Sequence, residues 1–267
     1  MDILRRNNVH VSGRGEQAMV FVHGLGCDQS MWRRVVQAFS RDYKIVLFDY
    51  VGSGKSDMKA YDPDRYSTLQ GYANDVIEVC DALDLHHAIL VAHSVSSMIC
   101  MLAAIERPQR IGRLVMLCPS PRYLNDLPGY TGGFEKADID GLLRMIEHNH
   151  SDWPKYLAGM VVRGANHESS MEEMEATFCA MDPLVAGRFA RTTFLSDSRE
   201  QVGESTTPTL ILHCAEDALA PPSVAEYLRD NMANSTLRQM DATGHSPHLT
   251  DQDETIACIR DFLQQPA

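Results

Sequence analysis

The chain contains a serine, an aspartate and a histidine, in that order, that could together perform nucleophilic catalysis. Ser94 stands in the segment LVAHSVSSM, where an apolar run ends and a helical pattern begins. A sharp strand-to-helix turn at such a junction lifts a serine hydroxyl out of a sheet and brings a helix N-terminus beside it. The flanking residues Ala92 and Ser96 are small, but neither is the glycine of the usual G-x-S-x-G pattern. Taken alone, this segment is a weak signal for a catalytic serine.

Candidates for the acid and the base follow Ser94 in the chain. Asp217 comes directly after a late apolar run in LILHCAEDALAPP, and His245 lies in the loop MDATGHSPHL before the last helical pattern. Glu216 could replace Asp217, and His248 competes with His245; each could also be an ordinary turn or loop residue. All three candidates nevertheless follow the right kind of element in the order nucleophile, acid, base. We therefore predict a catalytic triad of Ser94, Asp217 and His245.

An early loop carries a fourth part of this chemistry. The segment VFVHGLGCDQSMW contains HGLG, which is similar to the loop that supplies a backbone N–H to an oxyanion hole. The second donor of such a hole is the amide of the residue after the nucleophile. We therefore predict that the backbone amides of Leu25 and Val95 stabilise an oxyanion. The alternative is that Gly24 and Gly26 only form a turn.

Two other patterns do not indicate a cofactor. VGSGKSD (51–57) resembles a phosphate-binding loop, but that motif requires glycine where Asp49 stands. FDYVGSGKSD is more similar to a D-x-x-G-x-G-x-S loop with a structural role. The adjacent His86 and His87, and His148 and His150 at a spacing of two, do not pair with a cysteine or carboxylate in a pattern typical of zinc ligands. We expect no metal site and no organic cofactor.

The elements that must position these residues alternate between strands and helices. Nearly continuous apolar runs predict buried parallel strands over 18–24, 44–49, 88–94, 112–119 and 207–217. Helical patterns cover 69–83, 97–105 and 251–263. From about 134 to 194 only helical periodicity occurs, in four short stretches. This organisation predicts an α/β fold with a mostly parallel central sheet flanked by helices. We expect one domain over 1–267, with a core of 1–130 and 197–267 and a four-helix lid over about 131–196.

The composition limits the partners and the compartment. The formal net charge is −12 and no basic cluster occurs, which argues against nucleic acid and anionic membranes as partners. The seven cysteines are scattered and odd in number, a pattern typical of reduced thiols rather than a disulfide framework. No apolar stretch approaches the roughly 18 residues of a membrane span, and the N-terminus lacks an apolar signal region. We expect a cytoplasmic protein.

Several segments together resemble the RsbQ-like family of α/β-hydrolases, which includes a bacterial energy-stress regulator and the plant strigolactone and karrikin receptors. The segments are HGLGCDQSMW, FDYVGSGKSD, HSVSSM, SPRYLNDLPGYTGGFE, TTFLSDSRE and TGHSPHL. The resemblance covers nearly the whole chain and implies the α/β-hydrolase fold with the same triad. It also implies a substrate pocket lined by Leu25, Phe134, Trp153, Leu157 and Phe194. The chain departs from the family in having Ala92 in place of glycine and Leu25 where the plant receptors usually have phenylalanine.

The resemblance implies a slow hydrolase whose lid presents the occupied pocket to a signalling partner. That partner is a PAS-domain phosphatase for the bacterial regulator and an F-box protein for the plant receptors. We expect a monomer that hydrolyses a small hydrophobic ester, lactone or enol ether through an acyl-enzyme. A metabolic carboxylesterase or lactonase, and a binding module with an idle triad, are the alternatives.

Overall fold

A seven-stranded sheet forms the centre of the computed structural model, which describes residues 2–148, 152–163 and 167–265. The strands lie in the order β1-β3-β2-β4-β5-β6-β7. β1 pairs antiparallel with β3, and all other neighbours are parallel. The strand bounds are β1 His10–Gly13, β2 Ala18–Val22, β3 Lys44–Leu47, β4 Ala88–His93, β5 Ile111–Leu117, β6 Thr209–Glu216 and β7 Ser235–Thr243.

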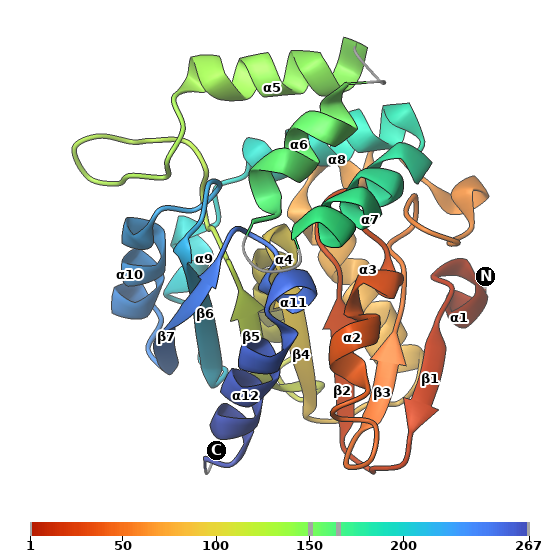
Figure 1. Cartoon of the computed structure of the whole chain (residues 1–267). Coiled ribbons are helices and arrows are strands. Elements are labelled where there is room, and N and C mark those ends of the chain that lie inside the picture. The colour runs from red at the N-terminus through yellow and green to blue at the C-terminus, as the bar shows by residue number, and fades with distance from the viewer. Residues whose placement is uncertain (1, 149–151, 164–166, 266–267) are drawn as a thin grey trace.

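Helices cover both faces of this sheet, which explains why its central strands are apolar throughout. Every residue of β2 and β4 is buried. Helices α2 (Arg33–Val36) and α12 (Gln252–Leu263) pack together on one face, and α3 (Leu69–Ala82) and α4 (Val95–Glu106) pack together on the other (Figure 1). A strand buried on both faces cannot alternate polar with apolar residues, so it reads as a continuous apolar run.

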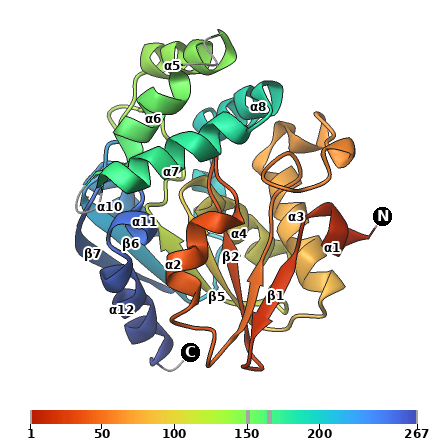
Figure 2. The ribbon, with the colours of Figure 1, turned by 45° about the vertical axis from the view of Figure 1, so that its right-hand side comes forward.

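Four helices inserted between β5 and β6 lie above the edge of the sheet where the parallel strands end (Figures 1 and 2). They are α5 (Lys136–His148), α6 (Trp153–Val161), α7 (His167–Ala180) and α8 (Pro183–Phe194), and we call them the lid helices. α5 packs against α8, and α6 packs against α7. The predicted fold class is therefore confirmed, whereas the exact lid boundaries of 131 and 196 stay a prediction.

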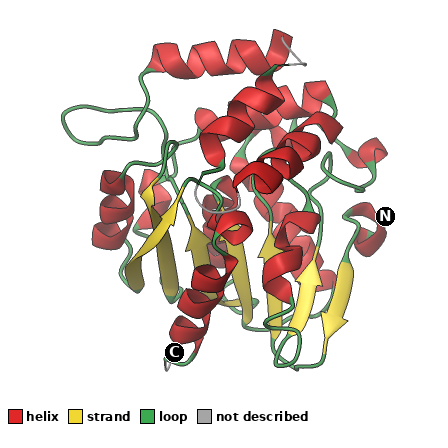
Figure 3. Cartoon of the chain, in the orientation of Figure 1, coloured by secondary structure: helices red, strands yellow, loops and turns green. Residues whose placement is uncertain are grey.

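The two strands that the sequence analysis did not predict, β1 and β7, are the edge strands of the sheet, whose strands are yellow in Figure 3. All four residues of β1 are exposed, and β7 mixes exposed with buried positions along its length. Edge strands of this kind lack the apolar run on which the strand prediction depended. The other helices are α1 (Ile3–Arg6), α9 (Arg199–Val202), α10 (Pro222–Asn231) and α11 (Pro247–Thr250), with short 3₁₀ turns at Gln29–Trp32, Met58–Ala60 and Arg65–Ser67.

The loop after β3 has structural hydrogen bonds at its aspartate. The Asp49 carboxylate accepts hydrogen bonds from the backbone amides of Gln29, at 2.9 Å, and Lys55, at 3.0 Å. It also accepts one from the Asn8 side chain at 2.7 Å. These bonds join three loops at one end of the sheet, in keeping with a structural role for this motif.

The cysteines and the helices also bear on the expected compartment. All seven cysteines are free, and Cys179 is the exposed one among them. Among the helices within the described ranges, none is both long and apolar enough to span a bilayer.

Candidate active site

Ser94 occupies a strained turn between β4 and α4. Its φ of +57° and ψ of −128° lie in a region that residues with a side chain rarely adopt. The Ser94 amide donates a hydrogen bond to the Leu117 carbonyl at the end of β5, at 2.8 Å. This bond holds the turn against the neighbouring strand. The hydroxyl consequently stands at the sheet edge that the lid helices cover.

Ser96, which replaces the second glycine of the usual motif, has a structural explanation. Its hydroxyl donates a hydrogen bond to the His23 carbonyl at 2.5 Å and lies 3.0 Å from the Tyr50 hydroxyl. A side chain at this position is therefore accommodated by bonds to the loop after β2. By contrast, a Cβ at Gly24 would lie 2.8 Å from the His93 ring, so that position is restricted to glycine.

The three predicted triad residues form one hydrogen-bonded chain. Ser94 Oγ lies 2.8 Å from His245 Nε2, and His245 Nδ1 lies 2.8 Å from Asp217 Oδ2. Because an ionised carboxylate only accepts, Nδ1 carries the proton that it donates to Asp217, and Nε2 is free to accept the proton of Ser94. Ser94 and His245 are 6% and 2% exposed, so this chain is shielded from bulk water.

The environment of Asp217 favours its charged form. Burial opposes ionisation, but the charge and hydrogen bond of His245 and the Leu219 amide outweigh it and lower the pKa of Asp217. The Asp217 carboxylate accepts from the amides of Leu219, at 2.8 Å, and Ala220, at 3.3 Å. These bonds hold the carboxylate in the orientation in which it accepts the hydrogen bond from the imidazole.

The structure separates the two alternatives from the triad. Glu216, which the sequence left as an alternative acid, points to the exposed surface. His248 is fully buried, but its ring packs on His93 and Trp32, with centroids 4.4 and 4.7 Å apart. Neither ring nitrogen of His248 has a hydrogen-bond partner among the described residues. Neither alternative contacts Ser94 through a hydrogen bond.

The two predicted oxyanion donors lie at the end of β2 and at the start of α4. The Val95 amide is in the first turn of α4, where N–H groups have no intrahelical acceptor. Within the described part of the chain, neither the Val95 nor the Leu25 amide donates a hydrogen bond to another group. Helix α7 covers the loop of Leu25 closely, because a Cβ at Gly26 would meet the Phe178 ring at 2.2 Å. Two amides without acceptors beside a buried serine can bind a developing negative charge.

A second histidine positions the backbone of the base. His93 Nε2 donates a hydrogen bond to the His245 carbonyl at 2.8 Å. On the other side, the His245 amide donates to the Val161 carbonyl at the end of α6, also at 2.8 Å. The loop that carries His245 is thus held between β4 and a lid helix. Burial, reinforced by the charge of His245, lowers the pKa of His93 to about 3, so its ring is neutral at physiological pH.

A narrow, mostly apolar cavity adjoins Ser94. Its volume, counted as the space open to the centre of a water molecule, is about 30 Å³. Besides Ser94 and His245, its lining contains Leu25, Leu157 and Phe194, as the resemblance implied. The sequence analysis missed other lining residues, contributed by loops and lid helices: Cys27, His93, Tyr123, Val161, Met174, Phe178, Thr193, Leu219 and Ser246.

Phe134 and Trp153 do not line this cavity, in contrast to the expectation. Trp153 packs against the ring of Phe178, with centroids 5.3 Å apart, and Phe178 contributes to the wall in its place. The backbone of Phe134 pairs with the loop after β5, where its amide donates to the Tyr123 carbonyl at 3.2 Å. Tyr123 provides the ring at the cavity, and its hydroxyl lies 3.4 Å from Ser94 Oγ. In both cases a neighbouring residue with an aromatic ring, Phe178 or Tyr123, lines the cavity instead of the predicted one.

A larger depression lies away from this chemistry. It measures about 800 Å³, is broadly open, and lies between α8, α9 and the start of α3. None of the triad residues lines it. The chemical arrangement, rather than cavity size, therefore identifies the candidate site.

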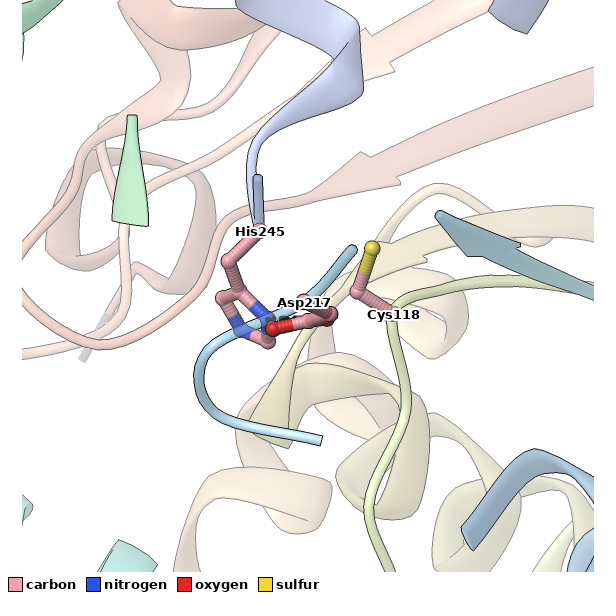
Figure 4. A group of neighbouring side chains, drawn as sticks. All are labelled: Cys118, Asp217 and His245. Carbon is pink, nitrogen blue, oxygen red and sulfur yellow. Dashed lines mark hydrogen bonds and ion pairs between the residues drawn. The ribbon is translucent and has the colours of Figure 1, made fainter. Parts of the chain in front are cut away.

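Cys118 adds a possible ligand atom next to the acid and the base. Cys118, Asp217 and His245 hold potential metal-binding atoms within 4.8 Å of one another (Figure 4). Asp217 and His245, however, hydrogen-bond to each other, and the Cys118 sulfur lies 3.6 Å from that of Cys214. The hydrogen bond with Cys214 and burial raise the pKa of Cys118 well above its usual value. Because metals bind thiolates, this neutral thiol makes the group a poor metal site.

Comparison with known proteins agrees with this geometry. A family model described as the alpha/beta hydrolase fold matches residues 17–252. The chain is 38% identical to a strigolactone esterase from Pisum sativum over 93% of each chain. It is also 38% identical to a karrikin insensitive 2 receptor from Petunia hybrida, over 95% of this chain and 94% of the receptor. The solved structure of a hydrolase from Oleispira antarctica matches with a TM-score of 0.96 and 40% identity, covering 99% of this chain and 97% of that one. The chain therefore belongs to the α/β-hydrolase fold family and is similar, within it, to plant strigolactone esterases and karrikin receptors.

Proposed function

We propose that this hydrolase is a serine hydrolase that cleaves a small hydrophobic ester, lactone or enol ether through an acyl-enzyme on Ser94. The observation that carries the proposal is the hydrogen-bonded chain from Ser94 through His245 to Asp217. A buried serine whose hydroxyl donates to an oriented imidazole is the arrangement that activates an oxygen nucleophile.

The acylation step begins with proton transfer. His245 Nε2 takes the proton of Ser94 as Oγ forms a bond to the substrate carbonyl carbon, and the carbonyl oxygen takes up the negative charge. The Asp217 carboxylate stabilises the imidazolium and keeps its Nδ1 proton in place. His245 then donates its proton to the leaving oxygen as the ester bond breaks, which leaves an acyl group on Ser94.

The amides of Leu25 and Val95 are proposed to stabilise the oxyanion of both steps. Neither amide has an acceptor in the described part of the chain, so both are available without breaking an existing bond. In the second step His245 takes a proton from water, whose oxygen attacks the acyl carbon. The collapse returns the proton to Ser94 and releases the acid.

The cavity supports a small, mostly apolar substrate. Leu25, Leu157 and Phe194, together with Met174 and Phe178, surround Ser94 with hydrocarbon, aromatic and thioether groups. The cavity volume of about 30 Å³ is far below the range of about 300–1,000 Å³ typical of ligand pockets, which favours a small substrate. A short acyl group or a small lactone ring fits this description better than a long chain does.

A signalling role coupled to slow turnover is part of the proposal. Its support is that similar proteins include one named a karrikin insensitive 2 receptor as well as one named a strigolactone esterase. The partner proposed by resemblance is a signalling protein such as a PAS-domain phosphatase. A plain metabolic carboxylesterase or lactonase is the second candidate, and a binding module with an idle triad is the third. We also propose a cytoplasmic monomer, in accord with the seven free thiols.

Stopped-flow hydrolysis of p-nitrophenyl butyrate tests this proposal. We expect native protein to release a burst of about one equivalent of nitrophenol and then turn over slowly, and Ser94→Ala to show neither phase. Ser97→Ala is the matched control, because Ser97 lies three residues along α4 and its hydroxyl bonds the Ala92 carbonyl. Fast steady turnover without a burst would favour the metabolic esterase. Absence of product from native protein would refute the triad assignment and favour the binding module.

A further inference from the structure

Thr193 lines the cavity beside Ser94 and carries a hydroxyl group. It lies on α8, is 1% exposed, and belongs to the buried stripe of that helix with Phe189 and Ala190. Its neighbour Phe194 lines the same cavity. Thr193 therefore faces the space in which the proposed substrate reacts, although it takes no part in the triad.

The Thr193 hydroxyl has no hydrogen-bond partner among the described residues. A helical threonine normally satisfies its hydroxyl at the carbonyl four residues earlier. Thr177 does so at the Glu173 carbonyl, at 2.8 Å, and Thr255 at the Asp251 carbonyl, at 3.1 Å. Thr193 departs from this pattern. A buried hydroxyl without a partner is unfavourable unless a bound molecule supplies one.

The polar side chains of Tyr123, Ser246 and His93, which also line the cavity, each contact or adjoin a triad residue. Tyr123 lies within 3.4 Å of Ser94 Oγ. Ser246 Oγ and His93 Nδ1 also lack partners, but Ser246 adjoins His245 and His93 holds the His245 carbonyl. Thr193 instead comes from a lid helix, between hydrocarbon and aromatic walls. Its hydroxyl can donate one hydrogen bond and accept others.

From this geometry we propose that Thr193 determines substrate specificity by donating a hydrogen bond to a second oxygen of the substrate. The preferred substrate class is then a small ester or lactone with an ether, carbonyl or hydroxyl oxygen in the group that occupies the cavity. All-carbon groups of the same size leave the hydroxyl unpartnered and are disfavoured. This inference rests on the proposed hydrolase function and adds the chemical character of its substrate.

Two isosteric esters test the inference. p-Nitrophenyl methoxyacetate differs from p-nitrophenyl butyrate by one ether oxygen in place of a methylene group. Thr193→Val keeps the side-chain shape and removes the hydroxyl. We expect this variant to lower the ratio of kcat/KM for methoxyacetate over butyrate about 5- to 10-fold relative to native protein. Using the ratio cancels the intrinsic reactivities of the two esters and any general loss of active enzyme.

Thr193→Ser and Thr192→Val are the matched controls. Thr193→Ser keeps a hydroxyl and should retain most of the native ratio. Thr192 is the neighbouring threonine, whose hydroxyl donates to the Tyr66 carbonyl at 3.2 Å, and its substitution by valine should leave the ratio unchanged. If native protein hydrolyses both esters and Thr193→Val keeps the native ratio, the inference is overturned while the proposed function stands.

A binding measurement separates failure of the inference from failure of the proposed function. Methyl methoxyacetate and methyl butyrate are titrated calorimetrically into Ser94→Ala protein, with and without Thr193→Val. The inference predicts that Thr193→Val weakens binding of the methoxyacetate selectively, even if native protein proves unable to hydrolyse either ester. Equal weakening of both ligands, or none, would contradict it.

Discussion

Two buried carboxylates, Asp75 and Asp217, show how a structural cluster differs from a reactive one. The Asp75 side chain has no exposed surface and lies on α3, where its two oxygens are saturated with donors. These are Arg6 Nη2 at 3.2 Å, Arg65 Nη2 at 2.9 Å, the Tyr66 hydroxyl at 2.9 Å, Asn7 Nδ2 at 3.1 Å and the Val51 amide at 3.1 Å. This cluster joins α1, the loop after β3 and α3. All of its bonding capacity serves the fold.

The Asp217 side chain is equally buried, but some donors and acceptors near it have no hydrogen-bond partner. It holds one imidazole, whose other nitrogen accepts the Ser94 proton. The amides of Leu25 and Val95 and the hydroxyl of Thr193 have no acceptor among the described residues. Unsatisfied donors around a cavity, rather than burial of charge alone, therefore distinguish a site that binds a reacting molecule.

The largest expected effect comes from Asp217→Asn. The amide can hold the imidazole in the wrong tautomer, so we expect kcat for p-nitrophenyl butyrate to fall about 10³- to 10⁴-fold. The free energy of unfolding should change far less than the activation free energy. Steady-state kinetics and urea unfolding of the same preparation check this. A loss of activity that merely follows a loss of folded protein would remove the distinction between the two carboxylates.

Asp75→Asn should show the opposite behaviour. Removing the charge leaves Glu78 as the remaining anion of the Arg6 and Arg65 guanidinium groups, and the new amide nitrogen cannot accept the hydrogen bonds that the carboxylate accepts. We therefore expect a cost of about 1–3 kcal/mol of stability. We expect kcat per folded molecule to stay close to the native value, because the cluster does not contact the triad. Urea unfolding, together with active-site titration, measures both quantities. A kcat reduced 100-fold in fully folded Asp75→Asn protein would contradict the structural role.

The third expected effect concerns pH. Burial lowers the pKa of His23, His93, His213 and His248 below the usual value. The unfolded chain therefore binds more protons than the folded one below about pH 6.5, so stability is fully present above that pH and is lost as pH falls. Each such histidine contributes a slope of up to about 1.4 kcal/mol per pH unit.

Urea unfolding between pH 5 and 7 measures this slope for native protein and for His248→Phe. In the variant, the slope of the unfolding free energy against pH should be smaller by up to the contribution of about one proton. The exposed His10, changed to glutamine, is the control and should leave the slope unchanged. An unchanged slope in His248→Phe would mean that this buried ring does not oppose protonation.

The smallest expected effect comes from Leu25→Ala. The change removes part of the cavity wall and so enlarges the cavity, but it keeps the backbone amide proposed for the oxyanion hole. One or two extra methylenes in an apolar pocket are typically worth about 1–3 kcal/mol, and only part of that is gained here. We expect the ratio of kcat/KM for p-nitrophenyl hexanoate over butyrate to rise about 3- to 10-fold. An unchanged ratio would indicate that the acyl group does not contact Leu25.

The sequence predicted the centre of the fold better than its rim. Strands β2, β4 and β6 are apolar because helices cover both of their faces, so they are recognisable from single runs. β1 and β7 lie at the edges of the sheet, and their exposed residues carry no such signal. The sequence analysis predicted His245 and Asp217 with His248 and Glu216 as alternatives, and the structure adds the contacts that separate each pair. Within each short segment both candidates have suitable chemistry, and only the surrounding fold decides which one lies within hydrogen-bond distance of the other triad residues.

The reactive groups, their order and the elements that carry them follow from the sequence, because strand and helix periodicity and the glycines of tight turns are local properties. Which of these groups meet depends on the tertiary structure. Ser94 and His245 are 151 residues apart in the chain, yet their reacting atoms lie within 2.8 Å. The same holds for the cavity wall, where Phe178 takes the place expected for Trp153, and for the unpartnered hydroxyl of Thr193. Burial and the lack of a partner are set by all the neighbours of a group at once, and those neighbours come from segments that only folding brings together.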